Sequence, residues 1–268
     1  MIERIRPYDP RMNRKTVAFL ALALACAACS GPERYQRHFD TSVWSHGLQR
    51  HAEDPAQWVP EVGLAALTAG LIFVDADFTE DSQHQYLTGG DTFSGDVVST
   101  VLGFTPLLVG AVEWAQGDAG RSFEIASEAL LLTSGATELL KRTTNRRRPG
   151  NSASRDSFPS GHTSFAAAGA TLLAREIEAG TGSRLGYLFF VPALYVAVDR
   201  VEGQRHWATD VAAGVALGMF LTHWVYNAHY PRESASDRTI FSRPKTFDWS
   251  LAPVITDDGF ALAWKVSI

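Results

Sequence analysis

The sequence has little cysteine. Its two cysteines, Cys26 and Cys29, lie near the N-terminus, and the rest of the 268-residue chain contains none. A disulfide-stapled fold needs cysteines spread through the domain, so that class is excluded. Collagen-like and disordered chains are excluded too, because 46% of the residues are hydrophobic and only 20% are charged. The composition predicts one sizeable apolar core.

Positive charge is also scarce. The chain holds 24 Lys and Arg against 29 Asp and Glu, which gives a net charge of −5 at pH 7. A protein that binds the phosphate backbone of nucleic acids needs an excess of basic surface. Nucleic acid is therefore not expected as a partner.

Long apolar runs are rare. A membrane-spanning helix needs about 20 apolar residues, but the charge-free stretches 62–74, 97–112 and 185–198 hold 13, 16 and 14 residues. Only 211–231 reaches 21 residues, and it contains two histidines. These lengths favour buried helices of a bundle tethered to a membrane. The alternative is a bundle whose helices cross the bilayer.

The N-terminus has the pattern of a secretory signal peptide. A basic segment at 11–15 precedes an apolar run at 17–25, and small residues follow up to Cys29. We expect a signal peptide over residues 1–28, starting at Met1 or Met12. An uncleaved anchor helix is the alternative.

Small residues before a cysteine resemble a bacterial lipobox, although Cys26 stands where leucine is usual. Lipidation of Cys29 would tether the mature chain to a membrane surface without spanning it. We therefore expect a lipoprotein of the bacterial cell envelope that faces the periplasm, at the outer rather than the inner membrane.

Most of the remaining chain predicts helices. A polar lead-in over 29–60, with one short helix at most, precedes helix-length blocks of small and apolar residues separated by Gly, Pro and charged residues. The blocks are 61–74, 96–115, 122–143, 162–179, 185–199 and 208–228. They predict an all-α bundle of about six core helices over residues 61–230.

The C-terminal extension, 231–268, has a different pattern. Apolar residues alternate with others on both sides of Asp257-Asp258-Gly259. This period of two around an Asp-Gly turn predicts a short β-hairpin. Its apolar face should pack on the bundle or touch lipid, because a lone hairpin is unstable.

Residues suited to phosphate chemistry lie in the segments 141–149, 159–162 and 199–210; the first holds five basic residues and no acid. Guanidinium groups match phosphate oxygens, and lysine adds a point charge. A Ser-Gly pair at a helix start offers a hydroxyl, a backbone N–H and the positive end of the helix dipole. The predicted phosphate site comprises Lys141, Arg148, Ser160, Gly161 and Arg200.

Two histidines supply the catalytic groups that phosphoester hydrolysis requires. Asp210 lies four residues after His206, so on one helical turn it would accept the imidazole N–H and leave the other nitrogen nucleophilic. His162 has no such partner in its own segment and lies beside the Ser-Gly donors. We therefore predict His206 as nucleophile, Asp210 as its orienting group and His162 as general acid.

The pattern Lys141-x6-Arg148-Pro149, Pro159-Ser160-Gly161-His162 and Arg200-x5-His206-x3-Asp210 resembles the three-part signature of the type 2 phosphatidic acid phosphatase (PAP2) family. Its superfamily also contains bacterial non-specific acid phosphatases and vanadium haloperoxidases. One departure is Asp199, which stands where the family has serine before the arginine. An acid there is expected to hold or partly neutralise Arg200.

The resemblance implies a helical phosphatase that forms a phosphohistidine on His206 and needs no metal or other cofactor. We expect a phosphomonoester or pyrophosphate of a lipid as substrate, since a lipid anchor near a phosphate pocket favours one. A broad-specificity periplasmic acid phosphatase, a vanadium-dependent haloperoxidase and a non-catalytic anion-binding lipoprotein are the alternatives.

Other charged residues have plainer interpretations. An acidic segment at 75–81 is expected to be a solvated loop, with a cation site as the alternative. Arg142, Arg146 and Arg147 fall outside the signature, and either guide anionic substrates or are simply exposed. His223 and His229 lie past the signature and are interpreted as structural.

Overall fold

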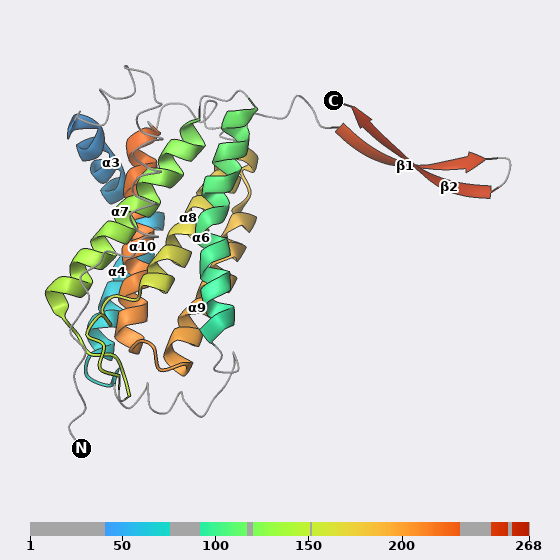
Figure 1. The fold of residues 1–268 in the computed structure, drawn as a ribbon. Helices are drawn as coiled ribbons and strands as arrows, with labels where there is room; N and C mark the ends of the chain where they lie inside the picture. The colour runs from blue at the N-terminus through green and yellow to red at the C-terminus, as the bar shows by residue number, and fades with distance from the viewer. Residues whose placement is uncertain are drawn as a thin grey trace.

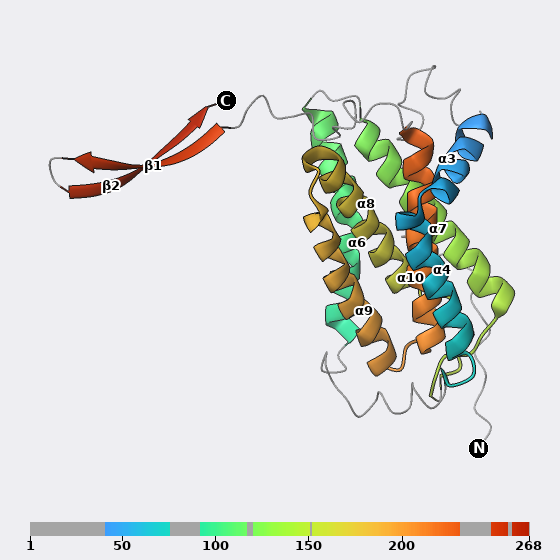
Figure 2. The ribbon, with the colours of Figure 1, turned by 180° about the vertical axis from the view of Figure 1, so that it is seen from behind.

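The computed structural model describes residues 41–75, 92–116, 120–150 and 152–230, and the backbone of 248–256 and 259–267. The described part is a bundle of long helices that run roughly side by side (Figures 1 and 2). The predicted signal peptide and Cys29 lie outside the described residues.

The helices follow the predicted blocks closely, which confirms the all-α class for the bundle. Their bounds are α3 Thr41–Glu53, α4 Pro55–Leu71, α6 Thr92–Ala115, α7 Arg121–Thr144, α8 Gly161–Thr181, the 3₁₀ helix η1 Arg184–Phe189, α9 Phe190–Glu202 and α10 Ala208–His229.

The main difference lies in the lead-in, which was expected to be irregular apart from one short helix; α3 fills much of it, and α4 begins before residue 61. The start of α4 has a local cause: the Asp54 side chain accepts the Ala56 N–H at 3.1 Å, and Pro55 occupies the first turn, where no N–H is needed.

The core centres on α8 and α10, which pack against each other and against most of the other helices. Glycines on α10 allow the close approach. A Cβ on Gly214 would lie 2.7 Å from the carbonyl oxygen of Ser160, and one on Gly218 would overlap with that of Ser164. The two backbones therefore meet where larger residues would force them apart.

Four helix ends meet at one end of the bundle, drawn at the bottom in Figure 1: the C-terminal ends of α7 and α9 and the N-terminal ends of α8 and α10. The loop from α7 to α8 closes on this end, because the Ser157 N–H bonds the Arg146 carbonyl at 3.1 Å and the Ser160 N–H bonds the Asp210 carbonyl at 2.9 Å. This arrangement brings the three predicted motif segments together.

Helix α6 is less buried than the sequence led us to expect. Two helices, Phe93–Ala115 and Ala208–His229, are long and apolar enough to cross a membrane, but only 33% of the window in the first is buried against 67% in the second. The charge-free stretch of α6 does not all face the core, because Val97, Val101, Leu108 and Val112 project outward at helical spacing.

Two strands, β1 Asp248–Thr256 and β2 Gly259–Ser267, pair antiparallel with Thr256 opposite Gly259. Their side chains lie outside the described residues. The hairpin and the packing of its apolar face stay predictions.

Candidate active site

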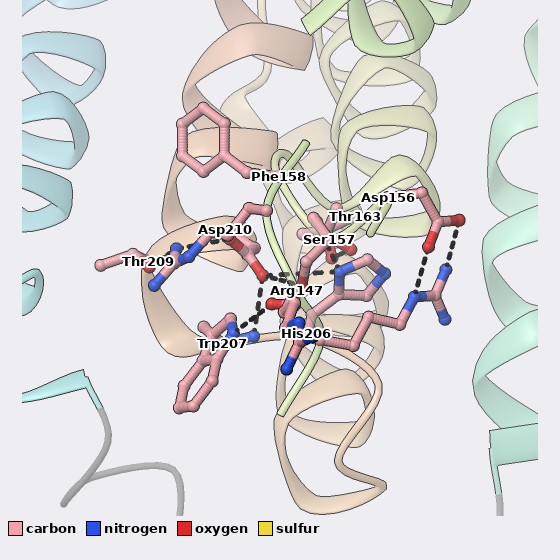
Figure 3. Close-up of polar contacts among 12 residues, drawn as sticks. Arg147, Asp156, Ser157, Phe158, Thr163, His206, Trp207, Thr209 and Asp210 are labelled. Atoms are coloured by element: carbon pink, nitrogen blue, oxygen red, sulfur yellow. Dashed lines mark hydrogen bonds and ion pairs between the residues drawn. The ribbon is translucent and has the colours of Figure 1, made fainter. Parts of the chain in front are cut away.

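His206 lies in the short loop between α9 and α10, and it is 2% exposed. Its Nδ1 atom is 2.7 Å from the backbone carbonyl oxygen of Ser157 (Figure 3). A carbonyl only accepts, so Nδ1 carries the hydrogen and Nε2 keeps its lone pair in the neutral ring. Burial lowers the pKa of His206, against the opposing effect of Asp210. The hydrogen bond to Ser157 and the burial of the ring both favour neutral His206 with a nucleophilic Nε2.

Asp210 supports this arrangement differently from the sequence expectation. Its Oδ2 atom is 3.7 Å from His206 Nδ1, beyond hydrogen-bond distance. The same oxygen accepts the Ser157 hydroxyl and, at 2.9 Å, the Trp207 N–H (Figure 3). The physical reason is that α10 begins only at Ala208, so His206 and Asp210 do not share a helical turn. The carboxylate caps its own helix and reaches the imidazole through Ser157.

Arg146 and Asp75 are parts of the site that sequence reasoning missed. Arg146 donates to Asp210 Oδ1 at 2.6 Å and also to Thr209 and Asp75. Asp75 is 4% exposed and accepts the Thr209 N–H at 3.1 Å. The expectation of a solvated acidic loop is therefore wrong for Asp75, whereas residues 76–81 lie outside the described residues.

The reason for this burial is the Arg146 cation. The ion pair and the hydrogen bonds with a guanidinium offset the loss of hydration of a buried carboxylate. Arg146 belongs to a basic run, and no sequence signal set it apart from Arg147, whose side chain is exposed.

Arg148 lies at the rim of the site and forms a bidentate pair with Asp156. Its Nε and Nη2 atoms donate to the two carboxylate oxygens, each at 2.9 Å (Figure 3). Burial works against the charge on Asp156, but the hydrogen bonds and the charge of Arg148 lower the pKa of this carboxyl overall. The pair fixes the guanidinium plane, and other N–H groups of the fork remain as donors for an anion.

Arg200, at the end of α9, is buried between two carboxylates. Its Nη2 atom is 2.6 Å from Asp199 Oδ2, and its Nη1 atom is 2.6 Å from Asp96 Oδ1. The departure from the family pattern therefore has the expected effect, because Asp199 holds Arg200. Gly95 makes room on α6, since a Cβ there would overlap with the Asp199 carboxylate.

His162, in the first turn of α8, also contacts the Asp96 carboxylate. Its Nε2 atom is 2.9 Å from Asp96 Oδ1. Burial and the positive charge of Arg200 lower the pKa of His162 to about 4, although Asp96 acts to raise it. His206 also contributes to this shift, so both imidazoles lie within one electrostatic site.

Asp96 was not predicted as a site residue. A single Asp96 oxygen bridges the guanidinium of Arg200 and the imidazole of His162. A phosphoryl oxygen bound between these two groups would make the same pair of contacts.

The remaining predicted residues occupy the rim and the floor. Ser160 is fully buried, and its hydroxyl is 2.9 Å from that of Thr163. Gly161 opens α8 with the Lys141 ammonium close by, 3.5 Å from the position a Cβ would take. Burial lowers the pKa of Lys141, partly offset by Asp156. The helix N-terminus and the ammonium thus face the same space.

An apolar cavity of about 710 Å³ lies beside the motif loop. Phe158 and Pro159, next to Ser157, form one wall, and α4 and α10 form much of the rest. Its lining includes Trp58, Val62, Ala65, Leu140, Ala213, Ala216, Leu217 and Phe220. Concave apolar surface next to a polar site is typical of a binding site for an amphiphile.

Two known phosphatases are similar to parts of the chain. The chain is 30% identical over 172 residues to the lipid A 1-phosphatase of Porphyromonas gingivalis, with 60% of this chain and 37% of that protein covered. It is 36% identical over 85 residues to the "Probable lipid phosphate phosphatase 4" of Arabidopsis thaliana, with 28% of each chain covered. The chain thus spans little more than a third of these relatives at most.

No solved structure matches the chain. The family model of the PAP2 superfamily matches residues 125–234, a range that contains all three motif segments and every phosphate-binding and catalytic residue predicted above. Over residues 125–234 the chain is therefore similar to the PAP2 superfamily.

Proposed function

We propose that the protein is a phosphatase that removes the phosphate group of a lipid phosphate through a phosphohistidine intermediate. The observation that supports this best is the His206 ring, whose Nδ1–H is fixed by the Ser157 carbonyl at 2.7 Å so that Nε2 is the free nucleophile. The names of the two relatives, both phosphatases of lipids, support the substrate class.

The first step is an attack of His206 Nε2 on phosphorus. The P–N bond forms as the bond to the lipid oxygen breaks, and His162 gives its proton to the departing alkoxide. Water then attacks the phosphohistidine, loses a proton to His162, and releases inorganic phosphate with His206 restored. Lys141, Arg148, Arg200 and the α8 N-terminus would stabilise the charge on the phosphoryl oxygens.

Protonation of His162 depends on the substrate. Its pKa of about 4 leaves the free imidazole neutral near pH 7. A phosphate dianion bound between Arg200 and His162 adds negative charge where positive charge now dominates, and this raises the pKa of His162 toward the value a general acid needs.

The apolar cavity supports a lipid rather than a soluble ester. It reaches the motif loop at Phe158 and Pro159 and continues between α4 and α10. An acyl chain placed there would leave the headgroup phosphate near the N-terminus of α8. This favours a lipid phosphatase over the acid phosphatase alternative.

Phosphate release from phosphatidic acid in detergent micelles tests the nucleophile. We expect His206→Ala to lower kcat by a factor of a thousand or more, because a covalent step has lost its nucleophile. Wild-type enzyme quenched in alkali should carry a phosphate that is stable to base and released by acid, and the variant should lack it. Equal turnover by the two proteins would contradict the assignment.

A bulky substitution in the cavity tests the lipid. Ala216→Trp should lower kcat/KM for phosphatidic acid at least tenfold while turnover of a water-soluble aryl phosphate stays within twofold. Parallel loss on both substrates, with the far-ultraviolet circular dichroism unchanged, would argue that the cavity does not hold the acyl chain.

For the location, the predicted lipid anchor at Cys29 and the periplasmic side of the outer membrane remain part of this proposal. The exposed apolar face of α6 supports membrane association of the bundle itself. Metabolic labelling with a fatty-acid analogue, lost in Cys29→Ser, tests the anchor. The predicted C-terminal hairpin belongs to the same proposal as an element that packs on the bundle.

A further inference from the structure

A second polar cluster lies inside the bundle, away from the candidate active site. It consists of His51 at the end of α3, Glu61 on α4 and His223 on α10, each no more than 6% exposed. His223 follows Asp210 by 13 residues on α10. The cluster therefore lies about 20 Å from Asp210 along the helix axis. We propose that His51, Glu61 and His223 bind one divalent transition metal ion, with Zn²⁺ as the probe.

The donor atoms already converge on one point. Glu61 Oε2 is 2.8 Å from His51 Nε2, and Glu61 Oε1 is 2.7 Å from His223 Nδ1. One ligand atom from each residue lies within 4.8 Å of the others. Ligands of a tetrahedral Zn²⁺ lie roughly 3.3 Å apart for bonds of about 2.0 Å. To admit the ion, the two Glu–His contacts would lengthen by about half an ångström, and the two imidazole nitrogens, at most 4.8 Å apart, would move closer together.

The donor set suits the ion. Two imidazoles and one carboxylate form a three-ligand site of the kind that Zn²⁺ occupies with an open fourth position. His51 and Glu61 both line the apolar cavity, so a water molecule can reach the fourth position from it. Binding would link α10 to the neighbouring helices α3 and α4, since His223 lies 162 residues after Glu61 in the sequence.

An outer shell of hydrogen bonds orients the ligands. His51 Nδ1 is 3.2 Å from the side-chain oxygen of Gln57, which also accepts the Asn227 amide at 2.6 Å. The other end of Gln57 donates to Asp54 at 2.8 Å. Because this oxygen only accepts, His51 carries hydrogen on Nδ1 and directs Nε2 at Glu61.

That direction has a cost unless a cation intervenes. In a neutral His51 with hydrogen on Nδ1, the Nε2 lone pair would face a carboxylate oxygen at 2.8 Å. Either a second proton on His51 or a metal ion removes this repulsion. These two states make opposite predictions about metal content, so they can be distinguished directly.

Metal content of the purified full-length chain tests the proposal. The protein is stripped with a chelator, dialysed against a small excess of Zn²⁺, passed through a desalting column and measured by plasma mass spectrometry. We expect about one Zn²⁺ per chain in the wild type and at least a tenfold lower content in His51→Ala and in the isosteric Glu61→Gln. Loading with Co²⁺ should give the intense visible absorption of a four-coordinate site.

Two controls isolate the cluster. His229→Ala removes another His–Glu pair, in which Nε2 lies 2.7 Å from Glu128, and His206→Ala removes the catalytic imidazole. Both should keep the bound Zn²⁺. A metal-free wild type, or equal Zn²⁺ in wild type and well-folded Glu61→Gln, would overturn the proposal and identify the cluster as a protonated His51–Glu61 pair. This readout does not depend on phosphatase activity.

Discussion

Three arginines of the candidate site are each held by at least one aspartate. Asp156 holds Arg148, Asp199 and Asp96 hold Arg200, and Asp210 holds Arg146. These pairs fix the guanidinium groups before a ligand arrives, which lowers the cost of ordering them on binding. An incoming phosphate must also compete with these aspartates for the arginines.

Arg146 compensates two buried carboxylates, and its loss should destabilise the protein. We expect Arg146→Ala to lower the free energy of unfolding by about 3 kcal/mol, because removing one partner leaves uncompensated buried charge on Asp75 and Asp210. Thermal unfolding should show a Tm lower by roughly 6–12 °C. Arg147→Ala is the matched control, since its side chain is exposed and its contact with Trp207 uses the backbone carbonyl. A similar Tm for both variants would contradict this role.

Asp96 should set the pH range of activity if His162 is the general acid. Asp96 acts to raise the pKa of His162, so Asp96→Asn lowers that pKa further. The protonated fraction of His162 falls as the pH rises through its pKa; the variant should therefore lose activity at lower pH than the wild type. At a fixed pH on this basic limb we expect a loss of up to about tenfold, as befits a partly exposed pair.

The profile of kcat/KM against pH for one soluble phosphoester makes this comparison, because substrate ionisation is common to both enzymes. Arg200 should keep its contact with Asp199 in the variant, because Asp199 is unchanged. A basic limb that is unmoved, or that moves to higher pH, would rule out the proposed role of the carboxylate.

Among the elements, α8 and α10 determine the geometry of the site. The N-terminus of α8 carries Gly161 and His162, and the N-terminus of α10 carries Asp210. Their mutual distance depends on glycines on α10, so the catalytic groups and the packing of these two helices are coupled.

Gly218→Ala tests this coupling. The new Cβ would overlap with the Ser164 carbonyl oxygen, a backbone atom that cannot move alone. We expect the free energy of unfolding to fall by about 1–3 kcal/mol and phosphatase activity to fall with it. Gly135→Ala on α7 is the matched control, because a Cβ there meets nothing within 4 Å. It should stabilise the helix by about 0.5–1 kcal/mol in chemical denaturation. Equal effects would show that the α8–α10 contact tolerates side chains.

On the scale of the whole molecule, large apolar side chains are exposed on the outer faces of α6 and α9. Val101 and Leu108 on α6 are 60% and 64% exposed, and Val191 and Leu194 on α9 are each 64% exposed. Exposed apolar side chains on two helices that pack against each other mark a lipid or protein contact. The bundle is therefore expected to bind membranes without an acyl anchor.

Flotation with neutral phosphatidylcholine vesicles checks this expectation in a Cys29→Ser background. The parent should float with the vesicles, and Val101→Glu with Leu108→Glu should shift most of the protein to the bottom fraction, because each charge must be placed in an apolar phase. Thermal stability should change little, since both side chains are exposed. Unchanged flotation would show that the α6 face is not the membrane contact.

The helical class, the approximate bounds of the helices and the three motif segments could be predicted from the sequence. Helical blocks follow from local periodicity, and the residues at 141–148, 160–162 and 200–210 follow from short spacings that chemistry constrains. Each of these signals lies within a few turns of chain.

The acids that complete the site could be identified only from the folded chain. Asp96 lies 104 residues before Arg200, and Asp75 lies 71 residues before Arg146. Contacts over such separations produce no periodic pattern in the sequence. An isolated aspartate is therefore predicted to be solvated, because the sequence does not show that a buried cation lies beside it. The role of Ser157 was not predictable either, because its backbone carbonyl orients His206 and a backbone group gives no sequence signal. The cluster of His51, Glu61 and His223 likewise forms only when three helices come together.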